Sequence, residues 1–229
     1  MGRIVSSMIL QALQRYLREP VNTLSHFVGV ILSLLGLIVL LDLSESDPWR
    51  LTSFAIYGLS SILLYTSSTL LHGLKVKERA ERVLLRLDHA AIFIMIAGSY
   101  TPLTLITLRE YSPAWGWTLF GIVWGTAILG VIFKLFWLDA PRWLSTGLYL
   151  LMGWLAVIAV GPMMQTLPVG GLAWLVVGGL FYSVGALVFI FERPDFYPGL
   201  LGHHELWHML VLAGSVSHFL LLLFYVLPV

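Results

Sequence analysis

Three histidines in apolar surroundings have the spacing and the chemistry of metal ligands. His204 and His208 are four residues apart, so on a helix they share a face with their Cβ atoms about 6 Å apart. That separation suits two ligands of one metal ion. His72 lies at the end of a separate apolar segment and is the third candidate ligand. Three neutral imidazoles with one open position are typical of catalytic zinc, whereas ions that prefer oxygen would not select histidine. The pattern therefore predicts a zinc site.

A carboxylate and a hydroxyl accompany these histidines. Asp88 begins the next apolar segment, and Ser68 lies one helical turn before His72. In a zinc site Asp88 would hold the zinc-bound water or accept its proton, while Ser68 would orient that water or stabilise an oxyanion. The competing interpretation is that the histidines only form hydrogen bonds between helices, which is the default for a single polar residue in a membrane.

The segment from His204 to His208 also matches the HExxH motif of zinc peptidases. In such an enzyme Glu205 would be the general base. On a regular helix, however, Glu205 is turned about 100° from His204, and Asp88 already offers a carboxylate. We rank the peptidase interpretation below one in which Asp88 is the base, and leave it open.

The whole chain has the composition of a membrane protein. Of its 229 residues, 59% are hydrophobic and 11% are charged, against roughly 25% charged in a soluble domain. Seven apolar runs approach or exceed the roughly 20 residues of a transmembrane helix. They lie near residues 24–41, 51–74, 88–108, 114–137, 143–163, 171–191 and 204–226. We predict an all-α seven-transmembrane helix bundle that forms one domain over residues 1–229, with the bundle itself over residues 19–229.

The distribution of basic residues predicts how the bundle is inserted, because lysine and arginine are retained on the cytoplasmic side. With the N-terminus in the cytoplasm, only Arg50 and Arg109 of the 13 lysines and arginines fall on the other side. We therefore expect a cytoplasmic N-terminus and an external C-terminus. The candidate ligands and the carboxylate then share one depth near the cytoplasmic face.

Other polar residues have more than one interpretation. Residues 1–18 combine apolar residues at helical spacing with basic ones, which predicts a helix on the cytoplasmic membrane surface. Glu19, Asn22 and His26 share one face of the first span and either brace the zinc site, contact a lipid headgroup or form a polar helix start. His218 lies near mid-membrane, where hydrogen bonding within the bundle is the default and a role in a substrate pocket is the alternative.

Composition excludes several classes of site. The chain contains no cysteine and has a formal net charge of +1. Disulfides, thiolate metal sites and cysteine nucleophiles are therefore excluded, and no basic block suggests a nucleic-acid partner. The expected partner is a membrane lipid, as substrate or ligand. The pattern leaves the oligomeric state open, a homo-oligomer included.

Four segments together resemble the hemolysin III group of bacterial membrane proteins. This group belongs to the progestin and adipoQ receptor superfamily, which includes the adiponectin receptors. The segments read EPVNTLSH (19–26), STLLH (68–72), LDHAAIFIMIAGSYTP (87–102) and HELWHMLVLAGSVSH (204–218). The resemblance covers all seven predicted spans.

This resemblance implies a bundle inserted opposite to G-protein-coupled receptors, in the bacterial cytoplasmic membrane. It implies zinc held by His72, His204 and His208, with Asp88 and Ser68 around the zinc-bound water. In the wider superfamily, which includes alkaline ceramidases, the metal centre is linked to hydrolysis of lipid amides. The bacterial relatives are associated with membrane lipid homeostasis and, by their name, with haemolysis.

Two differences from the receptor members limit which of their properties can be expected of this chain. The chain has no extended N-terminal soluble region, and Glu205 replaces a glutamine found in the receptors, so hormone binding is not expected. The leading hypothesis is a zinc-dependent, ceramidase-like hydrolase of a lipid amide or ester. A lipid sensor with structural zinc is second and a haemolysin-like pore is third. The sequence separates the first two poorly, because the fourth zinc position can hold a catalytic water or a bystander.

Overall fold

The computed structural model describes residues 12–197 and 201–228 of the chain. Within this part, seven helical spans are long and apolar enough to cross a membrane. Four are single helices: α2 (Pro20–Asp42), α3 (Pro48–Gly73), α6 (Pro113–Phe136) and α9 (Val169–Phe191). Three are composite: α4 (Glu78–Pro102) with η1 (Leu103–Leu108) and α5 (Arg109–Tyr111); α7 (Arg142–Gly153) with η2 (Trp154–Ala159) and α8 (Val160–Thr166); α10 (His203–Leu221) with η3 (Leu222–Val226).

Each predicted apolar run corresponds to one of these spans, so the seven-helix prediction is confirmed. The third span begins earlier than expected, at Glu78. Its first turns are charged, with Glu78 and Glu81 placed where acidic residues favour a helix N-terminus. The prediction that Asp88 opens this span is therefore wrong, and Asp88 lies about three turns inside the helix. The predicted surface helix falls mainly on residues 1–11, outside the described residues.

Pro102 is accommodated within the third span. Because proline lacks a backbone N–H, it removes one hydrogen bond of the helix. The chain continues from Pro102 into the π-helical segment η1, a wider turn that absorbs such a defect. The Thr104 hydroxyl donates to the carbonyls of Tyr100 and Thr101, at 3.0 Å each. The third span thus continues through Pro102 with a local change of helix type.

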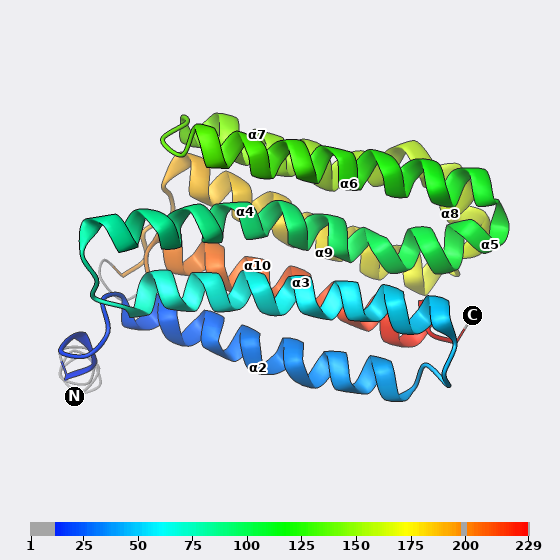
Figure 1. Cartoon of the computed structure of the whole chain (residues 1–229), viewed down its shortest axis with the longest axis horizontal. Coiled ribbons are helices and arrows are strands. Elements are labelled where there is room, and N and C mark those ends of the chain that lie inside the picture. Colours follow the sequence, from blue (N-terminus) through cyan, green and yellow to red (C-terminus); the bar gives the residue numbers. More distant parts are fainter. Residues whose placement is uncertain (1–11, 198–200, 229) are drawn as a thin grey trace.

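The spans form a closed ring in which α4 is the most enclosed. Helix α2 packs on α3, α3 on α4, α4 on α6 and α9 on α10, and α10 returns to α2; α7 contacts α4, α6 and α9 (Figure 1). In the apolar part of the span Glu78–Tyr111, 78% of the residues are buried, whereas the share is 17% in that of Pro20–Asp42. Residues on the third span therefore face the protein interior, and α2 presents most of its surface to lipid.

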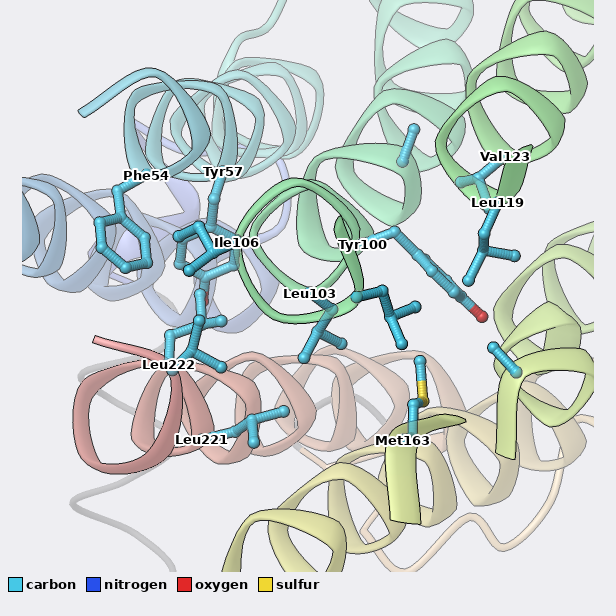
Figure 2. Packing of buried hydrophobic residues seen from close by; sticks show 14 of the residues in the cluster. Phe54, Tyr57, Tyr100, Leu103, Ile106, Leu119, Val123, Met163, Leu221 and Leu222 are labelled. Atoms are coloured by element: carbon cyan, nitrogen blue, oxygen red, sulfur yellow. The ribbon is translucent and has the colours of Figure 1, made fainter. Parts of the chain in front are cut away.

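A tight hydrophobic core fills one end of the bundle. Figure 2 shows Tyr100, Leu103 and Ile106 of the third span at its centre. Residues of four neighbouring spans surround them: Phe54, Tyr57, Leu119, Val123, Met163, Leu221 and Leu222. At the other end, α3 finishes and both α4 and α10 begin (Figure 1). The chain thus has a packed end and an end to which three helices bring their polar residues.

Candidate metal centre

Three histidines from two helices meet at the polar end of the bundle. His72 lies in the last turn of α3, and His204 and His208 lie in the first two turns of α10. One ligand atom from each lies within 4.8 Å of the other two. Nitrogens bound to one tetrahedral zinc ion at about 2.0–2.1 Å lie about 3.4 Å apart, so an approach of at most about 1.5 Å between ligand atoms closes the site. The predicted three-histidine cluster is confirmed, and it can hold a metal ion.

Two ring nitrogens of this cluster are free of hydrogen bonds within the described part of the chain, as metal ligands must be. Nε2 of His204 and Nδ1 of His208 are buried, and neither has a hydrogen-bond partner among the described residues. Burying a polar atom without a partner costs free energy. A metal ion that accepts these lone pairs would remove that cost, so the donor set fits such an ion.

The third histidine is held by a carboxylate from α2. Nδ1 of His72 lies 2.7 Å from Oε2 of Glu19. Since an ionised carboxylate can only accept, Nδ1 carries the proton and Nε2 is left free as a ligand. A carboxylate behind a metal-binding histidine fixes its tautomer and its orientation. This contact decides between the interpretations of Glu19, because its side chain braces the cluster and does not cap α2.

Glu19 is itself held in place by two neighbours. The Asn22 amide donates to the same Oε2 at 2.9 Å, and the Arg18 guanidinium lies 3.2 Å from Oε1. The hydrogen bond with His72 lowers the pKa of Glu19 to about 2; Asn22 and Arg18 act in the same direction, and burial opposes them. Glu19 is therefore an ionised acceptor at neutral pH.

His26 extends the same face of α2 along the cluster. Its ring stacks on that of His208, with centroids 3.6 Å apart and planes 11° from parallel. The Tyr65 ring meets it edge-on at 5.1 Å. The helical spacing of Glu19, Asn22 and His26 was visible in the sequence, but their contact with the histidines depends on how α2 is rotated against α3 and α10.

Asp88 and Ser68 lie beside the cluster without joining it. Both are buried, with 7% and 1% of their surface exposed, and both line a cavity with His26 and His208. The candidate ligand atoms that lie within 4.8 Å of one another belong to the three histidines and do not include Asp88. The structure thus places both residues in the wall of a cavity that His208 of the cluster also lines.

The cavity has a volume of about 240 Å³ and continues from this polar end toward Leu221 and Leu222. Apolar residues of α4, α7, α9 and α10 form most of its wall. Val157, Val160 and Val176 line it and are each more than half exposed. The wall of the cavity on η2, α8 and α9 is therefore thin, because these lining residues also reach the outer surface of the bundle.

Glu205 has a separate role at the start of α10. Its Oε2 accepts a hydrogen bond from the backbone N–H of Gly202 at 2.9 Å. This is one half of a capping box, which stabilises the helix N-terminus. The geometry agrees with the expectation that Glu205 points away from the ligand-bearing face.

Comparison with known proteins identifies the family. The family described as "Haemolysin-III related" matches residues 14–219. The chain belongs to this family. It is 42% identical over 212 residues to "Hemolysin-3" of Bacillus cereus, covering 92% of each protein. It is 40% identical over 213 residues to the "Hemolysin-3 homolog" of Bacillus subtilis (strain 168), covering 92% of this chain and 95% of the relative.

The haemolysin III similarity extends to animal proteins. The chain is 27% identical over 202 residues to the human "Monocyte to macrophage differentiation factor", covering 86% of this chain and 80% of that protein. The predicted membership of the hemolysin III group within the progestin and adipoQ receptor superfamily is confirmed. The four segments that carried the prediction are those that meet around the histidine cluster and the cavity.

Proposed function

We propose that this chain is a zinc-dependent hydrolase that acts within the membrane on a lipid amide or ester. The observation that carries the proposal is a three-histidine cluster at the head of an apolar cavity that also contains Asp88 and Ser68. A cavity of this kind suits an acyl chain, and its polar end suits the head of the same lipid.

The donor set favours zinc over the alternatives. Imidazole suits zinc, whereas magnesium and calcium take oxygen ligands. His72, His204 and His208 would hold the ion and leave a fourth position open. Zinc bound there would supply Lewis-acid polarisation of a carbonyl and would activate water at neutral pH.

The protein residues have distinct tasks in this proposal. Asp88 accepts a proton at its carboxylate during attack of water on the carbonyl and returns it to the leaving group. The Ser68 hydroxyl donates a hydrogen bond to the developing oxyanion or orients the water. Glu19 keeps Nε2 of His72 available. The apolar wall holds the acyl chain, and separation of η2–α8 from α9, where the wall is thin, would admit lipid directly from the bilayer.

A role in membrane lipid homeostasis follows from this activity. Hydrolysis of a bilayer lipid changes the composition of the membrane that contains the enzyme. We place the chain in the bacterial cytoplasmic membrane, with the histidine cluster on the cytoplasmic side, on the distribution of lysine and arginine.

The test is turnover of a total bacterial lipid extract by the purified protein in nanodiscs, before and after zinc removal. We expect the loss of one lipid species and the release of a free fatty acid, both abolished by chelation and restored by zinc. If zinc-loaded protein binds lipid but hydrolyses none, the hydrolase proposal is wrong and a lipid sensor with structural zinc takes its place. Release of vesicle contents without lipid hydrolysis would instead support a pore.

A further inference from the structure

A second polar group lies deep in the same cavity, far from the metal centre. His218 is on α10, ten positions after His208, which corresponds to about 15 Å along the helix axis. Its ring lines the cavity and is only partly buried. His218 is therefore a polar side chain near the middle of a membrane span, next to a space that can hold a ligand.

The surroundings of His218 give the ring room but leave it without a hydrogen bond. Gly178 of α9 lies against the ring, and a Cβ at that position would collide with the imidazole. Tyr182 meets it edge-on, with ring centroids 5.4 Å apart. Nε2 is buried on the side of the ring that faces Gly178 and has no hydrogen-bond partner among residues 12–197 and 201–228. The ring is exposed to the cavity at its other edge, which carries Nδ1.

Nearby polar groups that line this part of the cavity have partners within the protein. The Tyr182 hydroxyl lies 2.9 Å from the Ser215 hydroxyl, which also accepts from Tyr65 at 2.6 Å. The Ser99 hydroxyl donates to the Ile96 carbonyl at 2.8 Å. These hydroxyl groups have hydrogen-bond partners within the protein in the absence of a ligand. Nε2 of His218 has no such partner among the described residues.

An unpaired polar group costs most where neither water nor protein can satisfy it, as in the hydrocarbon region of a membrane. A ligand that places a hydroxyl or keto group against Nδ1, or against Nε2 after the ring has turned toward the cavity, would give the imidazole a partner and lower this cost. We propose that His218 is a second ligand-binding residue, which selects lipids with an oxygenated acyl chain whose polar group lies about 15 Å from the head at the metal centre. The proposal rests on the proposed occupation of the cavity by lipid and adds the chain specificity.

The test measures binding and needs no turnover. Stearate and a hydroxystearate with its hydroxyl on carbon 12, which is the position nearest to the required distance, contain no amide or ester bond, so their affinities do not depend on hydrolysis. Both are titrated into zinc-loaded protein in nanodiscs, with tryptophan fluorescence as the readout. We expect the wild type to bind the hydroxylated acid about tenfold more tightly, as one hydrogen bond in an apolar site allows.

Variants then assign the preference to the ring. His218→Leu should bind both acids equally, and His218→Gln, which keeps a donor and an acceptor, should retain part of the preference. Thr126→Ala removes a paired hydroxyl, which donates to the Ile122 carbonyl at 2.7 Å outside the cavity, and it should behave as the wild type. Zinc content, measured on each protein, shows that the metal centre is intact.

Two results would overturn this role of His218: equal affinities in the wild type, or a preference that persists in His218→Leu. Neither result would bear on hydrolysis at the metal centre. Conversely, a protein that hydrolyses no lipid but discriminates the two acids through His218 would retain this binding site and lose the proposed enzymatic function.

Discussion

His72 and Glu19 are joined at 2.7 Å, between Nδ1 of the imidazole and Oε2 of the carboxylate. The two residues lie 53 positions apart in the chain, on α3 and at the start of α2. The contact links the first span of the bundle to the metal centre. It fixes the tautomer of His72, which is the one candidate ligand that does not come from α10.

Glu19→Gln tests this link. Glutamine keeps the size of the side chain, but it loses the charge that holds the N–H of His72. We expect zinc affinity to fall about 10- to 100-fold, as is typical for such supporting carboxylates. Competition with a fluorescent zinc chelator measures the change. Glu81→Gln is the matched control, because Glu81 contacts Arg18 and not His72; equal affinities in both variants would contradict the bracing role.

Removal of any one of the three candidate ligands should lower the zinc content of the protein. The purified wild type should contain about one zinc ion per chain, and His72→Ala, His204→Ala and His208→Ala should each lower zinc content, because two ligands cannot close the coordination sphere. Elemental analysis of the purified proteins gives the answer. His203→Ala, next to the cluster on the same helix, should retain zinc. Full zinc content in His208→Ala would disprove the ligand assignment.

The orientation of the bundle is open to a direct test. A reporter fused after Val229 should be external, and one inserted within residues 75–86 should be cytoplasmic, because basic residues are retained on the inside. Paired alkaline phosphatase and green fluorescent protein fusions distinguish the two sides. A cytoplasmic C-terminus would reverse the predicted placement of the histidine cluster.

Because α3 packs closely on α4, one methyl group added between these helices should lower the stability of the protein. A Cβ at Gly98 would collide with the Ser60 side chain, whose hydroxyl is tied to the Tyr57 carbonyl. Gly98→Ala should therefore destabilise the protein by about 1–3 kcal/mol. Gly121→Ala is the control, since a Cβ at Gly121 would meet nothing within 4 Å. Thermal unfolding in detergent compares them, and equal stability would show that the helices separate without cost.

The sequence was sufficient to predict the helix bundle and the three-histidine cluster. Apolar length located the spans, and the interval between His204 and His208 placed two ligands on one helical face. His72 joined them because helix alternation set all three at one depth. The charged start of α4 was missed, since an apolar criterion cannot detect a helix that begins at Glu78 outside the hydrophobic run.

Contacts that depend on helix rotation were beyond the sequence. The face with Glu19, Asn22 and His26 was recognised, but three interpretations remained until α2 was placed against α3 and α10. The contacts of His218 were likewise beyond the sequence, although its position near mid-membrane was expected. Whether its ring met a partner or a cavity depended on Gly178 and Tyr182 of another helix.

The central claim is that Asp88 is the base of a zinc-dependent hydrolase. Asparagine preserves the size of Asp88 and can still form a hydrogen bond, but it cannot accept a proton. The decisive measurement is lipid turnover together with zinc content for Asp88→Asn and Glu205→Gln. We expect Asp88→Asn to keep its zinc and lose turnover at least 100-fold, roughly the effect of removing a general base, and Glu205→Gln to keep most of both. Retained turnover in Asp88→Asn with an inactive Glu205→Gln would contradict the claim and favour the HExxH mechanism.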